Sequence, residues 1–418
     1  MQVREQRLRR DIEANAAFGS VAVENGHGRT VLTGTEADRN AREYFCERLR
    51  DAGLDVRVDR VGTIVGRWTP ESADPDATAV AAGSHLDSVP EGGIFDGPLG
   101  VYAALEAVRA MQDAGVEPAR PVDVVCFTEE EGQRFDGGLL GSAVAAGEMS
   151  LETALALEDD SGVTLEAALD DIGFLGEGRV AADEWHAWLE LHIEQSERLE
   201  DAEVPAGIVT TITGLSRCAI EIAGEANHAG STLMRDRSDA LAGASEFVLD
   251  VESAANERVE TESNTAVATV GKLDVRPGAP NVIPGRVEMS LDIRDIEQDS
   301  IEYVVERAKR SLDRIETERD VTTEFERPWN RHPVPMSDRC RAALEAAGEA
   351  ASIETLSLHS GAAHDTMHVA NVTDAGLLFA PSRDGISHNP LEWTEWEDCA
   401  ESTRVLAGAV TRLASADE

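Results

Sequence analysis

The sequence has little cysteine, almost no lysine and no long apolar run. Its five cysteines are scattered and never spaced as Cys-x-x-Cys, so we expect reduced thiols and no cysteine-ligated zinc. No apolar segment approaches the roughly 20 residues that cross a bilayer. The first residues, MQVREQRLRRDIEA, are charged throughout and lack the apolar core of a secretory signal. These absences predict a cytoplasmic globular protein with no membrane partner.

Acidic residues outnumber basic ones by 80 to 37, which gives a net charge of −43. Lys272 and Lys309 are the only lysines. A chain this acidic repels nucleic acid, so nucleic acid is not an expected partner. The acidic residues are spread along segments that keep their apolar periodicity, which indicates a strongly hydrated surface suited to high salt, as in halophilic proteins.

Length and periodicity predict an α/β protein with an inserted second domain. A chain of 418 residues with 42% hydrophobic content is long for one core. Apolar strands alternate with helices up to about residue 212, which is typical of a mainly parallel sheet. From 213 to 328 the pattern changes to alternating antiparallel strands with two helices, an α+β pattern. After 328 the first pattern returns, so we predict one domain formed by 1–212 and 329–418, with 213–328 inserted.

His85, Asp87 and Asp96 lie in the segment GSHLDSVPEGGIFDGPLG, directly after a predicted buried strand. Loops at the carboxyl ends of strands are where α/β folds carry chemistry. His85 and Asp87 alone are as typical of a capped turn as of a metal site. Asp96 favours the metal site, because glycines on both sides let the backbone fold closely around an ion. A dinucleotide loop is a poor alternative, since GxGxxG spacing is absent.

Three adjacent glutamates, Glu129 to Glu131, follow the next predicted strand in FTEEEGQRF. By themselves they are typical of a solvated acidic turn. A nearby dication would stabilise the ionised carboxylates and let two of them divide the roles of metal ligand and proton acceptor.

His192 in LHIEQ and His388 in GISHNP complete the candidate site, although a lone histidine is more often a structural or surface residue. Mixed nitrogen and oxygen ligation suits zinc, or manganese, cobalt or nickel. If Asp96 bridges, the set supplies ligands for two metals: His85, Asp96, Glu131, His192 and His388.

Seven motifs occur in order along nearly the whole chain: GSHLDSVPEGGIFDGPLGV, FTEEEGQRF, LHIEQ, GEANHAG, PNVIPG followed by SLDIRD, SGAAHD and GISHNP. With them the chain resembles the M20 metallopeptidase-related amidohydrolases, in the hydantoinase/carbamoylase branch. That branch contains N-carbamoyl-L-amino-acid hydrolases, β-ureidopropionases and allantoate amidohydrolases. The resemblance implies two divalent metal ions per subunit and hydrolysis of a linear amide C–N bond in a ureido acid, with release of ammonia and carbon dioxide.

The resemblance also implies a role for each member of the candidate site. One metal would be held by His85, Asp96 and His192, and the other by Asp96, Glu131 and His388. Asp87 would accept the other N–H of His85 and fix its tautomer. Glu130 would be the general base, because the family's glutamate pair directly precedes the glycine of this motif.

By the same resemblance, the inserted domain is a lid and dimerisation domain that contacts the substrate in a homodimer. His228 would polarise the scissile carbonyl across the dimer interface. Asn281 and Arg294 would bind the substrate carboxylate, Arg294 as a bidentate clamp. Gln195 would contact the ureido group. Without the resemblance, Asn281 is typical of a turn and Arg294 of an ion pair within its strand.

Thr63, Ser196 and Leu233 stand where the family usually has Asn, Gly and Pro. They lie near substrate-facing segments and remove no metal ligand, so the substrate stays open among N-carbamoyl-α-amino acids, N-carbamoyl-β-alanine and allantoate. A dipeptidase or aminoacylase of the same clan is an alternative. A non-catalytic binding protein with this fold would be expected to have lost a ligand or Glu130, and this chain has lost neither.

Overall fold

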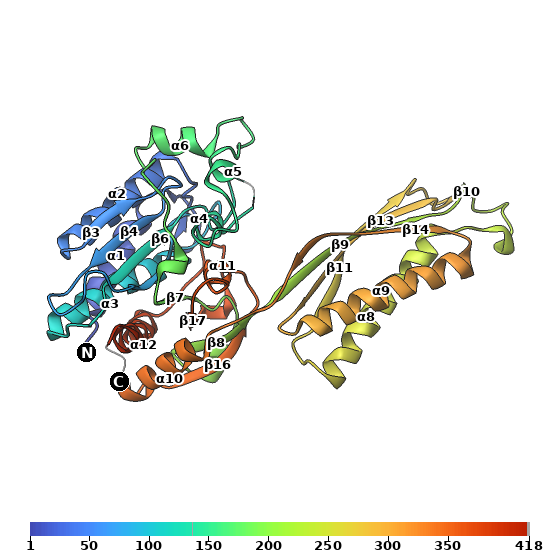
Figure 1. Cartoon of the computed structure of the whole chain (residues 1–418). Helices are drawn as coiled ribbons and strands as arrows, with labels where there is room; N and C mark the ends of the chain where they lie inside the picture. Colours follow the sequence, from blue (N-terminus) through green and yellow to red (C-terminus); the bar gives the residue numbers. More distant parts are fainter. Residues whose placement is uncertain (136, 416–418) are drawn as a thin grey trace. The chain divides into compact units, whose positions relative to one another are not determined.

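The computed structural model describes residues 1–135 and 137–415, and the chain divides into two units (Figure 1). The first unit contains Met1–Thr210 and the chain from Pro335 on, and the second contains Thr211–Val334. The second unit begins slightly before the predicted insert and ends slightly after it. Within the described ranges, every helix is too short or too polar to span a membrane.

The first unit is built on one mixed sheet whose centre is parallel, which confirms the predicted α/β class. The strand order is β15-β8-β17-β7-β5-β6-β4-β3, and β16 also pairs with β8. Strands β17, β7, β5 and β6 run parallel to one another, whereas β3 runs antiparallel to β4, β4 to β6, and β8 to β17. The strands are β3 (Asp55–Val58), β4 (Ile64–Trp68), β5 (Val80–His85), β6 (Val122–Phe127), β7 (Ala187–Ile193), β8 (Ala206–Ile212), β15 (Val334–Pro335), β16 (Thr355–Ser360) and β17 (Ala375–Ala380).

Apolar residues on successive positions of the central strands bury both faces of this sheet. In β5, Val80 and Ala82 face one core, to which α1 to α3, α10 and α12 also contribute. Ala81 faces a second core that contains Trp185 and Trp188. The helices are α1 (Glu5–Ala16), α2 (Glu36–Asp51), α3 (Pro98–Ala114), α4 (Leu140–Ala145), α5 (Leu151–Leu155), α6 (Leu165–Asp171), α7 (Arg198–Ala202), α10 (Asp338–Ala351), α11 (Thr366–Val369) and α12 (Trp396–Ala414).

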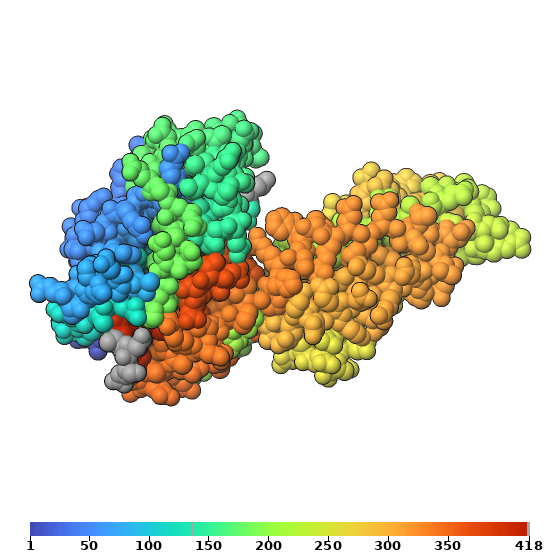
Figure 2. Space-filling view, viewed as in Figure 1, coloured from blue at the N-terminus to red at the C-terminus, as the bar shows by residue number. Residues whose placement is uncertain are grey.

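Both ends of the chain contribute to the first unit. The segment after Pro335, orange to red in the space-filling view, lies against the earlier blue and green segments (Figure 2). A short two-stranded ribbon of β1 (Ser20–Val21) and β2 (Gly28–Arg29) lies outside the main sheet. Arg29 of β2 forms an isolated bridge with Gly92, which places this ribbon beside the loop that carries the predicted metal ligands.

The second unit is a four-stranded antiparallel sheet, in the order β11-β13-β9-β14, with α8 and α9 on one face. Period-two alternation explains the arrangement: in β13, Met289 and Leu291 are buried, whereas Asp292 and Arg294 lie on the opposite face. A small ribbon of β10 and β12 adjoins the sheet. The elements are β9 (Gly214–Ala223), β10 (Asn227–His228), α8 (Ala240–Thr261), β11 (Val267–Arg276), β12 (Val282–Ile283), β13 (Arg286–Asp295), α9 (Gln298–Arg319) and β14 (Thr322–Arg331).

Candidate metal centre

The parallel strands of the first unit deliver the candidate ligands to one edge of the sheet. β5 ends at His85, β7 ends directly after His192, and Glu131 follows the end of β6. His388 lies in the loop after β17. Because the carboxyl ends of parallel strands meet at the same edge, four separate stretches of sequence converge there.

The first ligand group consists of His85, Asp96 and His192, all buried. The Nε2 atoms of His85 and His192 lie 3.5 Å and 3.1 Å from Asp96 Oδ1. One ligand atom from each residue lies within 4.8 Å of the others. Both imidazoles therefore point at one carboxylate oxygen.

The second group consists of Asp96, Glu131 and His388. His388 Nε2 lies 3.5 Å from Asp96 Oδ2 and 3.3 Å from Glu131 Oε2. The His388 side chain is 50% exposed, whereas those of Asp96 and Glu131 are 6% and 5% exposed. Asp96 thus offers one oxygen to each group, which is the arrangement of a bridging carboxylate.

The charges and the unpartnered atoms of this site fit divalent cations. His85 Nε2 and Glu131 Oε1 are buried without a hydrogen-bond partner among the described residues. Burial, and then the neighbouring Asp96, raise the pKa of Glu131 to about 8. Burial also raises the pKa of Glu130 well above its usual range, and Glu131 adds to the effect. A dication between these carboxylates would relieve that repulsion.

Asp87 lies next to the ligand groups without belonging to either of them. Its carboxylate accepts the N–H groups of Glu130 and Glu131 at 3.3 Å and 3.0 Å. His85 Nδ1 lies 3.6 Å from Asp87 Oδ1 and 3.2 Å from the Asp87 main-chain oxygen. Although burial raises it, these contacts hold the pKa of Asp87 below its usual range. Asp87 therefore contacts both His85 and the backbone that carries the two glutamates.

The three consecutive glutamates have separate surroundings. Glu129 adopts a positive φ of 56°, and its carboxylate accepts the N–H groups of Arg134 and Phe135, both at 2.8 Å. Glu130 Oε2 instead lies 3.7 Å from His85 Nε2. Glu130 and Glu131 therefore belong to the site, whereas Glu129 stabilises the following turn.

Gln195 and Ser387 both contact the shared carboxylate. Gln195 Nε2 donates to Asp96 Oδ2 at 3.0 Å and to Ser387 Oγ at 2.8 Å, and Ser387 Oγ donates to the same Asp96 oxygen at 3.0 Å. The Gln195 Oε1 atom is buried without a partner among the described residues. The amide of Gln195 is thus placed at the ligand groups, and its oxygen is available to a further donor.

His364 and Asp365 also belong to this region, although the sequence analysis assigned them no role. The rings of His364 and His192 pack at 4.4 Å between centroids, and both His364 and Asp365 are fully buried. Burial lowers the pKa of His364 well below its usual range, and burial, followed by Glu190, raises the pKa of Asp365 to about 8. The motif SGAAHD was the available signal for both residues.

The second unit holds the other predicted substrate residues, in two separate places. His228 pairs with Val282 in the β10–β12 ribbon, and the N–H of Ala229 donates to the Asn281 carbonyl at 2.9 Å. Arg294 lies eight residues along β13 from Arg286, at the end remote from this ribbon, which corresponds to about 26 Å of strand. One copy of the unit therefore places His228 beside Asn281 but not beside Arg294.

Arg294 already has a carboxylate partner. Its Nε donates to Asp292 Oδ1 at 2.8 Å, on the face of the sheet opposite the helices. The ion pair expected for an arginine in a strand is therefore present. The Arg294 side chain is 36% exposed, so it is not closed off from solvent.

Comparison with known proteins adds a sequence family and close structural relatives. The profile of Peptidase family M20/M25/M40 matches residues 81–412. The chain is 40% identical over 404 residues to an N-carbamoyl-L-amino acid amidohydrolase of Geobacillus stearothermophilus, covering 96% of this chain and 97% of the relative. It is 33% identical over 406 residues to an allantoate amidohydrolase of Bacillus subtilis, covering 96% of each. A hydantoinase/carbamoylase family amidase from Burkholderia multivorans superposes with a TM-score of 0.92 at 34% identity, covering 100% of this chain and 99% of that chain.

Proposed function

Since the chain belongs to Peptidase family M20/M25/M40, we propose that it hydrolyses N-carbamoyl-L-amino acids to the free amino acid, ammonia and carbon dioxide. The enzyme is an amidohydrolase of carbon–nitrogen bonds other than peptide bonds, acting on ureido substrates. The observation that carries the proposal is the pair of ligand groups that share Asp96, with Glu130 beside them.

In this proposal two divalent cations, zinc or else manganese, cobalt or nickel, occupy the two ligand groups. When bound, these cations supply Lewis acidity, which acidifies water and polarises a carbonyl. Asp87 keeps the Glu130–Glu131 backbone in place through its two hydrogen bonds. The surrounding residues thus hold both the ligands and the base at fixed positions.

Glu130 is the proposed general base. It lies close to His85 yet is not a member of either ligand group. Its carboxylate takes a proton from the attacking water and delivers it to the leaving nitrogen. The amide oxygen of Gln195 accepts a hydrogen bond from the ureido group of the substrate.

His228, Asn281 and Arg294 are the proposed contacts from the second unit. His228 polarises the scissile carbonyl, and Asn281 and Arg294 bind the substrate carboxylate, for which Arg294 exchanges its bond to Asp292. About 26 Å of β13 separates Arg294 from the ribbon that carries His228. This distance supports the view that the two residues at one site come from different subunits. We propose a homodimer in which His228 and Asn281 come from one subunit and Arg294 from the other.

The substrate is tested by ammonia release. The purified enzyme is stripped with a chelator, reloaded with zinc, manganese, cobalt or nickel, and assayed at high salt. We expect the highest kcat/KM on an N-carbamoyl-L-α-amino acid, with lower values on N-carbamoyl-β-alanine and allantoate. Cleavage of dipeptides with no ammonia from any ureido acid would overturn the proposal.

The role of Glu130 is tested by the Glu130→Gln variant. We expect kcat to fall by a factor of about 10³, because the amide cannot accept the proton. Metal content, measured by plasma mass spectrometry, should stay at the wild-type value. Glu129→Gln is the matched control, since Gln retains the oxygen that accepts the N–H groups of Arg134 and Phe135. Equal activity in the two variants would exclude Glu130 as the base.

The proposed exchange of residues between subunits is tested by mixing two inactive variants. Equal amounts of Glu130→Gln and His228→Ala subunits are unfolded together and refolded, so that about half of the dimers are mixed and contain one subunit of each variant. If His228 acts on the partner subunit, one site of each mixed dimer has both residues, and about a quarter of the wild-type activity should return. If His228 acts within its own subunit, no activity returns and the exchange is refuted.

A further inference from the structure

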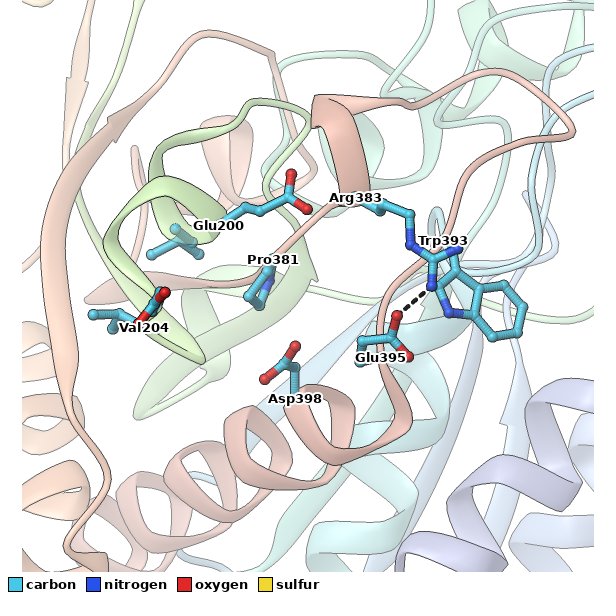
Figure 3. A pocket seen from close by; sticks show the side chains of 9 residues that line it. Glu200, Val204, Pro381, Arg383, Trp393, Glu395 and Asp398 are labelled. Atoms are coloured by element: carbon cyan, nitrogen blue, oxygen red, sulfur yellow. Dashed lines mark hydrogen bonds and ion pairs between the residues drawn. The ribbon is translucent and has the colours of Figure 1, made fainter.

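The loop between β17 and α12 carries His388 and is closed at its base. The Arg383 N–H donates to the Trp393 carbonyl, and Thr394 Oγ1 donates to the Pro381 carbonyl, both at 2.9 Å. Arg383 also pairs with Glu395 and lies over the Trp393 ring, beside a cavity of about 300 Å³ (Figure 3). These contacts fix the two ends of the loop, but none of them involves His388 itself.

A second contact joins the same loop to the segment that carries Asp96. Glu392, four residues after His388, is 1% exposed. Its Oε1 atom accepts the N–H groups of Phe95 and Asp96, at 2.8 Å and 3.0 Å. This carboxylate therefore joins the loop of His388 directly to the backbone of Asp96, the shared ligand.

The segment next to Glu392 has a glycine, Gly93, where the Glu392 side chain packs against it. A Cβ on Gly93 would lie 2.2 Å from the Glu392 carboxyl carbon, so a larger residue would push the two segments apart. The buried Arg29 guanidinium donates to the carbonyls of Leu86 and Gly93 in the same segment, at 2.9 Å and 3.1 Å. Arg29 and Glu392 thus both bind the segment that carries Asp87 and Asp96.

The histidines of the two ligand groups lie on different kinds of backbone. His85 and His192 lie on β5 and β7, neighbouring strands of the sheet. His388 has a positive φ of 55° and belongs to a loop. We propose that Glu392 is a positioning residue that sets His388 against Asp96, so that the Asp96, Glu131 and His388 group needs it to bind a cation. This inference rests on the metal sites of the proposed function.

The experiment measures cobalt binding rather than turnover. The stripped wild-type enzyme and its variants are titrated with Co²⁺, followed by visible d–d absorption and by plasma mass spectrometry after gel filtration. We expect two equivalents for the wild type and about one for Glu392→Ala, with the second affinity reduced at least about tenfold. Glu392→Gln should restore the second equivalent, because its amide oxygen can accept both N–H groups.

The controls separate positioning from general damage. Glu397→Ala removes a nearby exposed carboxylate on α12 and should bind two equivalents. Glu392→Ala combined with His388→Ala should bind as much cobalt as His388→Ala alone, since both changes affect one group. Two equivalents at wild-type affinity in Glu392→Ala would overturn the inference. A wild-type enzyme that binds no cobalt would instead overturn the proposed function.

Discussion

Several buried carboxylates of this acidic chain accept hydrogen bonds from backbone N–H groups. Asp87, Glu129 and Glu392 each accept two main-chain N–H groups. Asp59 accepts three, from Val61, Thr63 and Val180. Such bonds satisfy donors in turns that follow strands, where no ladder partner exists. These four carboxylates therefore stabilise the local backbone geometry of the first unit.

Asp59, which is not part of the candidate metal centre, should make the free energy of unfolding depend on pH. Burial raises the pKa of Asp59 to about 6, above the value of about 4 in the unfolded chain. The folded state thus binds the proton more tightly, and the free energy of unfolding should fall by about 3 kcal/mol between about pH 4 and pH 6. Asp59→Asn should lack this component. The free energy of unfolding is measured with urea at several pH values for both proteins. The same change with pH in wild type and variant would contradict the prediction.

Helix α3 packs against the strands that carry two of the candidate ligands. Its first turn follows Asp96, and a Cβ on Gly100 would lie 2.2 Å from the Leu191 carbonyl oxygen and 2.7 Å from Ser84 Cβ. The absence of a side chain at Gly100 therefore allows α3 to approach β5 and β7 closely.

We expect Gly100→Ala to lower the free energy of unfolding by about 3 kcal/mol, because the helix must move off the sheet. Cobalt affinity should fall as well, since Asp96 precedes the same turn. Gly115 lies at the other end of α3, where an added Cβ would have no atom within 4 Å. Gly115→Ala would therefore add only the strain of a non-glycine residue at a φ of 63°. It should cost about 1 kcal/mol and leave metal binding unchanged. If the two substitutions had equal effects on stability and metal binding, the close packing of α3 against β5 and β7 would not explain either property.

The chain as a whole has a net charge of −43, and this charge should make its stability depend on salt. Screening shortens from about 10 Å at 0.1 M salt to about 3 Å at 1 M. We therefore expect the free energy of unfolding to rise steadily with KCl concentration, as measured by thermal or urea unfolding. Replacing the exposed Glu117, Glu260 and Glu354 by Gln should reduce that slope. A slope of zero, or one unaffected by these substitutions, would refute a charge-driven dependence.

Much of the candidate site could be predicted from local sequence because its ligands follow strands. A ligand placed at the end of a parallel strand must lie at the same edge as the ligands of neighbouring strands, so the sequence alone groups His85, Glu131 and His192. The alternation of apolar residues likewise determined a mainly parallel first unit and an antiparallel insert.

Contacts between distant segments could not be read from such patterns. The separation of Glu129 from Glu130 depends on one positive φ, and the contact of Glu392 with Asp96 joins residues nearly 300 positions apart. The register of β13 places Arg294 far from His228 within one unit. The sequence by itself determined the candidate ligand residues and the strands that carry them. Only the tertiary structure decided that Glu129 and Glu392 bind backbone N–H groups, because packing between distant segments sets those positions.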